Sequence, residues 1–183
     1  MLFPFLLLLF LPRNGDSARV LGVLPTPSYS HQIVFRPIWK ELAKRGHEVV
    51  VITTDLENSN MTNIREIDVS FTYDLWLNKY KVFKQFVDDR DICDKELSHP
   101  PVRDLITNKS EHFDLVVVEN MVPIMMGFAE RFKCPSVAVT TLDFPNMYHT
   151  LLGSPDHPVA YPDPMLPFIE KMNFFGTTFE RTL

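Results

Sequence analysis

The sequence predicts an α/β domain built on a mainly parallel, doubly wound sheet, and three observations support this fold class. Short runs of branched apolar residues recur along the chain, and they are continuous rather than alternating, as expected for parallel strands buried on both faces. Amphipathic stretches with a helical period separate these runs. Proline and glycine mark many of the boundaries between the two patterns.

The first strand, helix and strand lie within a single βαβ unit, whose crossover is expected to be right-handed. Strands are predicted at Arg19–Leu24 and at Val49–Thr53, and a helix at Gln32–Arg45 between them. Gly46 is a natural end for that helix. Pro37 either kinks the helix or begins its regular part, because proline cannot donate an interior backbone hydrogen bond.

The alternation of elements continues toward the carboxyl terminus. The predicted elements are a strand at Val69–Tyr73, a helical pattern over Trp76–Leu105 interrupted at Pro100 and Pro101, a strand at Phe113–Glu119, a helix at Pro123–Phe132 and a strand at Ser136–Thr140. Residues 144–168 are rich in proline and aromatic residues and are predicted to form a long loop region. Its aromatic side chains either anchor the loop to the domain, cap a pocket or touch a membrane surface.

Composition is typical of one globular domain. The chain has 183 residues, of which 45% are hydrophobic and 22% are charged. Its formal net charge of −5 argues against a nucleic-acid-binding surface, which needs clustered lysine and arginine. Cys93 and Cys134 form either one disulfide or two thiols, and thiols are favoured because a disulfide framework would contain more cysteines.

The amino terminus is typical of a secretory signal peptide. An apolar run precedes Gly15 and Ser17, small residues that suit cleavage ahead of Ala18, so residues 1–17 are predicted to be the signal peptide. A buried or frayed amino-terminal segment is the alternative. Sequons at Asn60 and Asn108 agree with a chain that enters the endoplasmic-reticulum lumen or is secreted.

Several common enzyme motifs are absent from the sequence. It contains no glycine-rich dinucleotide fingerprint, no P-loop, no nucleophile elbow and no zinc-protease motif, since Val51 stands where His47-Glu48 would need a second histidine. The other histidines, which are His99, His112, His149 and His157, lack the spacing of metal ligands. We therefore expect neither a metal nor a bound cofactor.

A histidine and a glutamate are predicted to meet at one edge of the sheet. His31 follows the first strand and Glu119 ends a later parallel strand, and the carboxyl ends of parallel strands share the edge where ligands bind. Imidazole suits proton transfer near neutral pH, and a carboxylate can orient the ring and stabilise its cation. An ordinary pair of surface residues is the alternative.

An acceptor pocket is predicted beside this pair. Asn120 and Met121 follow Glu119 directly, which places them at the same edge. Phe86 belongs to an aromatic face at helical spacing that also includes Trp76, Tyr80 and Phe83. Such a face either lines an apolar pocket or fills the core.

Three sequence blocks resemble the UDP-glycosyltransferases, and the insect enzymes above all. The first comprises residues 25–32, Pro-Thr-Pro-Ser-Tyr-Ser-His-Gln, followed by residues 44–54, Lys-Arg-Gly-His-Glu-Val-Val-Val-Ile-Thr-Thr. The second is Phe113–Glu119, and the third combines Gly153-Ser154-Pro155 with Tyr161-Pro162. Together the blocks run over nearly all of residues 18–183.

This resemblance implies a two-domain GT-B glycosyltransferase, whose amino-terminal Rossmann-like domain binds the acceptor and whose carboxyl-terminal domain binds the UDP-sugar. The family's catalytic base falls on His31. Its partner, an aspartate in many members, falls on Glu119, which is one methylene longer. The implied reaction is inverting transfer of a hexose from a UDP-sugar, as co-substrate, to a hydroxyl of a small lipophilic acceptor.

The family's sugar-nucleotide signature and its membrane anchor have no counterpart in these 183 residues. We therefore expect residues 18–183 to form the acceptor-binding domain only, without the donor domain and without activity alone. Membrane association is expected of the longer enzyme. The alternatives are a non-catalytic module that binds a small molecule or a partner, and a fragment with no independent role.

Overall fold

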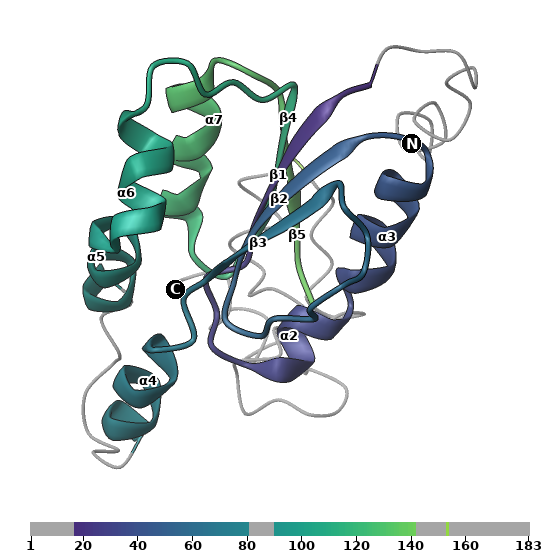
Figure 1. Ribbon diagram of the computed structural model, residues 1–183. Coiled ribbons are helices and arrows are strands. Elements are labelled where there is room, and N and C mark those ends of the chain that lie inside the picture. The colour runs from purple at the N-terminus through teal and green to yellow at the C-terminus, as the bar shows by residue number, and fades with distance from the viewer. Residues whose placement is uncertain (1–16, 81–89, 142–152, 154–183) are drawn as a thin grey trace, which may run out of the picture. The chain divides into compact units, whose positions relative to one another are not determined.

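A five-stranded parallel sheet forms the centre of the domain in the computed structural model, which describes residues 17–80, 90–141 and 153 (Figure 1). The strands are β1 (Arg19–Val23), β2 (Glu48–Thr53), β3 (Ile64–Asp68), β4 (Leu115–Glu119) and β5 (Ser136–Val139). Their order is β3-β2-β1-β4-β5, and every neighbouring pair is parallel. The predicted mainly parallel sheet is confirmed.

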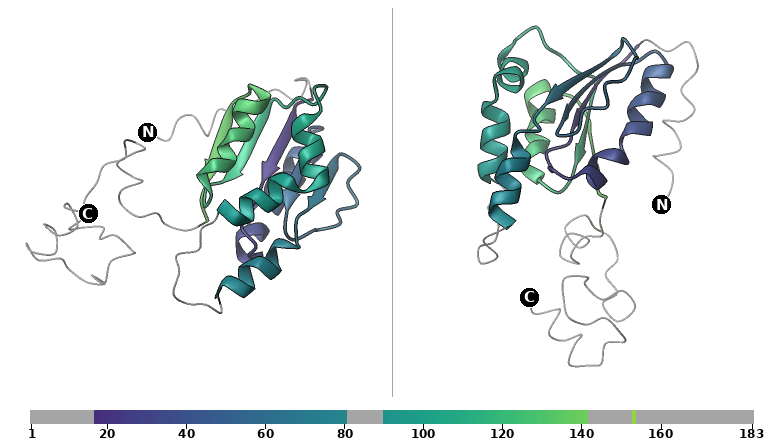
Figure 2. Two further views of the ribbon diagram at one scale, coloured as in Figure 1. Left: turned by 90° about the vertical axis from the view of Figure 1, so that its left-hand side faces the viewer. Right: turned by 60° about the horizontal axis from the view of Figure 1, so that its bottom comes forward.

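Helices cover both faces of the sheet, so the domain is doubly wound as predicted (Figure 2). They are α2 (Tyr29–Ile33), α3 (Arg36–Lys44), α4 (Thr72–Tyr80), α5 (Arg90–Ser98), α6 (Pro100–Thr107), the 3₁₀ helix η2 (Pro123–Met126) and α7 (Gly127–Phe132). Helix α3 lies against one face, and α5, α6 and α7 lie against the other. No helix in the described ranges is long and apolar enough to cross a membrane.

The core has two layers that follow from the continuous apolar strands. On one face Phe35 and Trp39 pack on valines of β2 and β4, and on the other face strand valines pack on Phe128 and neighbouring helical residues. Gly22 makes the first contact close, because a Cβ there would lie 2.7 Å from Cζ2 of Trp39. Cys93 and Cys134 are both thiols, as predicted.

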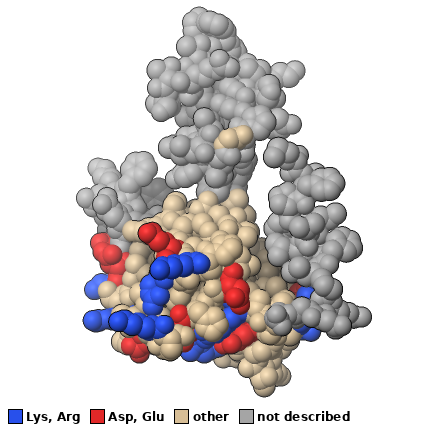
Figure 3. All heavy atoms as spheres, turned by 90° about the horizontal axis from the view of Figure 1, so that it is seen from above, with Lys and Arg blue, Asp and Glu red and all other residues tan. Residues whose placement is uncertain are grey.

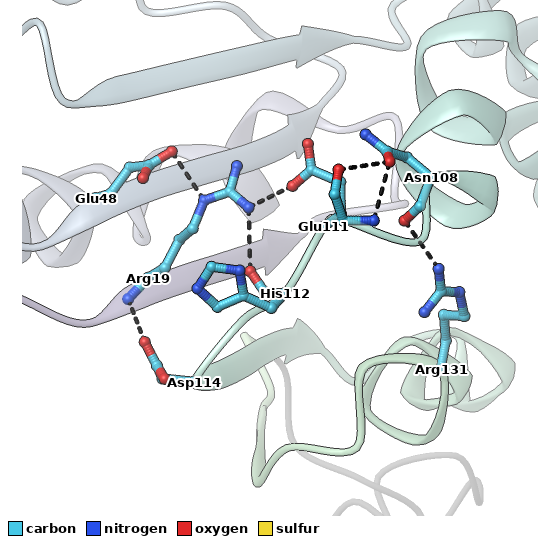
Figure 4. Close-up of polar contacts among 8 residues, drawn as sticks. Arg19, Glu48, Asn108, Glu111, His112, Asp114 and Arg131 are labelled. Atoms are coloured by element: carbon cyan, nitrogen blue, oxygen red, sulfur yellow. Dashed lines mark hydrogen bonds and ion pairs between the residues drawn. The ribbon is translucent and has the colours of Figure 1, made fainter.

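Ion pairs tie together the amino-terminal ends of three strands (Figure 4). The Arg19 guanidinium donates to Glu48 at 2.9 Å, to Glu111 and to the carbonyl of His112 at 3.1 Å, and the Arg19 backbone N–H donates to Asp114 at 2.7 Å. Acidic and basic side chains lie next to one another on the face seen in Figure 3. The charges at this edge are therefore used for local pairing, and the candidate site lies at the opposite edge.

The third strand was predicted in the wrong place. Residues Val69–Tyr73 were expected to be a strand, but β3 precedes them and α4 begins at Thr72. The real strand is at the edge of the sheet and half exposed, so its sequence Ile-Arg-Glu-Ile-Asp lacks a continuous apolar run. The Asp68 side chain then accepts from the backbone N–H of Ser70 at 2.8 Å and turns the chain toward the helix.

Three predicted helices are each divided in the structure, and the stretch Pro123–Phe132 contains η2 and α7. The stretch Gln32–Arg45 contains the end of α2 and the whole of α3, and Pro37 lies in the first turn of α3, where its missing N–H has no cost. In the stretch 76–105, α5 ends at Ser98 and Pro100 begins α6 for the same reason.

Candidate functional site

His31 lies in the short helix α2, which differs from its expected place in the loop before a helix. The Ser28 carbonyl accepts backbone hydrogen bonds from His31 at 3.0 Å and from Gln32 at 3.2 Å, so the helical turn begins earlier than the apolar periodicity indicates. This turn follows β1 after a five-residue loop, residues 24–28. The side chain is therefore held on a regular element at the edge of the sheet where α/β domains bind ligands.

The structure brings His31 and Glu119 into direct contact. Nδ1 of His31 lies 2.5 Å from Oε1 of Glu119. The glutamate side chain is fully buried at the end of β4, and the histidine side chain is 12% exposed. A histidine held in this way by a carboxylate carries its proton on Nδ1 when neutral, which leaves Nε2 as the atom that can accept a proton.

A buried threonine and a buried glutamine hold the loop between β1 and α2. The Thr26 hydroxyl donates to Oε2 of Glu119 at 2.5 Å. The Gln32 amide donates to the carbonyls of Leu24 at 3.1 Å and Thr26 at 2.8 Å, and its oxygen accepts from Thr53 at 2.7 Å. Sequence reasoning missed both roles, although a threonine between two prolines directly after a buried strand was a usable signal.

A second polar cluster follows β2. Oδ2 of Asp55 accepts hydrogen bonds from the hydroxyls of Thr54 at 2.9 Å and Tyr73 at 2.7 Å. Burial, together with the bond to the Asp55 carboxylate, raises the pKa of Tyr73 to about 12. The tyrosine is therefore a hydrogen-bond donor throughout the physiological pH range.

Asn120 and Met121 are half-buried and come directly after Glu119, the carboxylate of the His31–Glu119 dyad. The Asn120 backbone N–H donates to Val139 at 2.8 Å and continues the pairing of β4 with β5. Phe86 lies outside the described residues, and so does Phe83. A cavity of about 760 Å³ lies between β3 and α6 in the described part of the chain, and neither dyad residue lines it.

Glu96 is a buried carboxyl group that sequence reasoning did not single out. It is 1% exposed, and neither of its side-chain oxygens has a hydrogen-bond partner among the residues that the structure describes. Burial, and to a lesser extent the nearby negative charge of Glu119, raises the pKa of Glu96 to about 9. Glu96 comes three residues after Cys93 and one before Leu97, and both of these residues contribute to the core. This helical spacing was the available sign that Glu96 faces inward.

The arrangement as a whole can accept a proton from a bound hydroxyl. A carboxylate in contact with the ring nitrogen would stabilise the imidazolium formed in that step, as in other histidine–carboxylate pairs. Among the described residues, no three histidine, cysteine or acidic side chains are grouped as metal ligands.

Comparison with known proteins finds relatives named as UDP-glycosyltransferases and UDP-glucosyltransferases. The chain is 27% identical over 186 residues to "UDP-glycosyltransferase UGT4" of Dactylopius coccus, covering 92% of this chain and 35% of that protein. It is 28% identical over 183 residues to the ecdysteroid UDP-glucosyltransferase of Mamestra brassicae nuclear polyhedrosis virus, covering 86% and 35%. The counterpart in Lymantria dispar multicapsid nuclear polyhedrosis virus is 30% identical over 167 residues, covering 80% and 33%.

The chain spans about a third of the length of these curated relatives. No family model matches it.

Proposed function

Because the chain is a relative of the UDP-glycosyltransferases over about a third of their length, we propose that it forms the acceptor-binding part of such an enzyme. The proposed reaction transfers a hexose from a UDP-sugar to a hydroxyl of a small lipophilic acceptor, with inversion at the anomeric carbon. The contact between His31 and Glu119 is the observation that carries this proposal.

In the proposed mechanism Nε2 of His31 takes the proton of the acceptor hydroxyl. The oxygen attacks the anomeric carbon, the bond from that carbon to the UDP oxygen breaks, and UDP leaves with the electron pair. The Glu119 carboxylate stabilises the imidazolium, with an attraction of about 4 kcal/mol between unit charges at ~4 Å and an effective dielectric near 20, before desolvation is counted. The resemblance to the UDP-glycosyltransferases implies that the groups that bind UDP belong to a separate carboxyl-terminal domain.

A steroid alcohol is the acceptor class that we propose first, since two of the relatives described above are named ecdysteroid UDP-glucosyltransferases. A plant phenolic or another lipophilic alcohol fits the same chemistry. We further propose that the 183-residue chain binds such an acceptor but does not transfer sugar alone.

Acceptor binding can be located by NMR on the full chain. We expect a steroid alcohol to shift the resonances of His31, Asn120 and Met121, and UDP-glucose added alone to leave them unchanged. UDP-glucose shifting these signals while the alcohol does not would contradict the proposal. The alcohol could instead bind while the chain, fused to the remainder of a relative, transfers no sugar to it. That outcome would favour a non-catalytic module.

The two sequons provide a test of the proposed entry into the endoplasmic-reticulum lumen through a signal peptide at residues 1–17. Asn60 and Asn108 are both exposed. We expect expression in insect cells to give a product that migrates faster after N-glycosidase treatment, and Asn60→Gln and Asn108→Gln each to remove one step of this shift. A wild-type product that glycosidase leaves unchanged would argue against lumenal entry.

A further inference from the structure

The Glu119 carboxylate is held from two sides. Its Oε1 atom contacts Nδ1 of His31, and its Oε2 atom accepts the hydroxyl hydrogen of Thr26, each at 2.5 Å. Thr26 is 5% exposed and Glu119 is fully buried, so water competes little for either oxygen. The carboxylate therefore has one orientation in which both oxygens are satisfied.

Thr26 is itself fixed by the residue next to His31. The Gln32 side chain is 1% exposed, donates to the Thr26 carbonyl at 2.8 Å, and accepts from the Thr53 hydroxyl at 2.7 Å. The chain of contacts thus runs from β2 through α2 to the loop after β1 and on to β4. Its members come from three neighbouring strands, from the loop after β1 and from α2. The position of Thr26 therefore depends on several elements at this edge of the sheet and not on one loop alone.

We propose that Thr26 is a positioning residue for the His31–Glu119 pair, because its hydroxyl fixes the carboxylate in the orientation that keeps the proton of neutral His31 on Nδ1. The nitrogen that carries the proton is set by the hydrogen bond that the ring makes. Without the hydroxyl, Oε2 loses its buried donor and the carboxylate rotates to regain one, which weakens its hold on the ring. The effect on histidine follows from geometry, and only its effect on transfer rests on the proposed function.

The primary test is ¹⁵N NMR of the histidine ring in the full chain, which distinguishes Nδ1–H from Nε2–H. We expect the Nδ1–H form to dominate in the wild type, to fall below about half in Thr26→Val, and to return in Thr26→Ser, which restores the hydroxyl. Thr72→Val is the matched control, since that buried hydroxyl donates to Val69 at 2.8 Å and does not touch the dyad.

A purely structural role for Thr26 predicts a different result. Thr26→Val would then lower thermal stability about as much as Thr72→Val while leaving the tautomer unchanged, and this outcome would overturn the inference. Should Thr26→Val fail to fold, Thr26→Ser and Thr26→Cys decide the matter, because a thiol is a much weaker donor than a hydroxyl. If Thr26→Cys showed the same histidine tautomer as Thr26→Ser and the wild type, the inference would also be overturned.

Activity separates this inference from the proposed function. In a fusion of this chain with the remaining length of the Dactylopius coccus relative, we expect Thr26→Val to lower kcat about 10- to 100-fold with little change in KM for the UDP-sugar. A tautomer change in the full chain combined with an inactive wild-type fusion would support positioning by Thr26 and count against transfer. If the wild-type fusion is active and Thr26→Val leaves its kcat unchanged, the result would count against the positioning role of Thr26 but not against the proposed transfer.

Discussion

Replacing His31 with alanine is expected to lower kcat for glycosyl transfer by about 10²- to 10⁴-fold, the usual contribution of a positioned general base. The assay uses the fusion of this chain with the remaining length of the Dactylopius coccus relative and follows UDP release. KM for the UDP-sugar should change little, since the proposed base acts on the acceptor hydroxyl. The residual rate would come from binding and orientation of the two substrates.

His112→Ala is the matched control for this experiment. It removes an imidazole that is exposed beside Arg19, at the opposite edge of the sheet, and should leave kcat within about twofold of the wild type because it removes no contact of the dyad. Glu119→Gln should fall between the two, because its amide oxygen still accepts from Nδ1 while the charge that stabilises the imidazolium is lost. Equal activity of His31→Ala and His112→Ala would refute the proposed base.

The buried strands were predictable because burial on both faces imposes a pattern that few other structures share. Residues 49–53 are Val-Val-Val-Ile-Thr. They form all of β2 after its first residue, and all five are buried. The edge strand β3 was missed because its exposed positions hold arginine and aspartate and a half-buried position holds glutamate, as is common where a sheet edge faces water. The strand was instead expected at Val69–Tyr73, where aromatic residues mimic strand composition.

Only the part of the site that follows from strand topology could be predicted from the sequence. The rule that parallel strands share a carboxyl edge brings His31 and Glu119 together across 88 residues of sequence, and the structure places them in contact. It gives no account of Thr26, whose hydroxyl meets the carboxylate because of the backbone path between Pro25 and Pro27. The same rule does not predict which face of α5 is turned toward the core, and it is this orientation that buries Glu96.

The chain is expected to become more stable when Glu96 is replaced by glutamine, by about 3 kcal/mol in the free energy of unfolding at pH 7. The carboxyl group has a pKa of about 9 in the folded chain against an ordinary value of 4.5, because burial disfavours its charged form. Between these two values the unfolded chain releases a proton that the folded chain retains. Wild-type stability due to this group is therefore complete below pH 4.5 and is lost as the pH rises toward 9, whereas glutamine does not titrate.

Urea unfolding at pH 5, 7 and 8.5 tests this sign directly. The difference between Glu96→Gln and the wild type should be small at pH 5 and grow by about 1.4 kcal/mol per pH unit. Glu41→Gln is the matched control, since its side chain is 53% exposed in a surface pair with Arg45 and should change stability by less than about 1 kcal/mol at every pH. A constant difference between Glu96→Gln and the wild type from pH 5 to 8.5 would mean that Glu96 ionises in the folded chain as it does in the unfolded one. Glu119 would then have a second negative charge near it at neutral pH, and the imidazolium of His31 would be stabilised by two carboxylates rather than one.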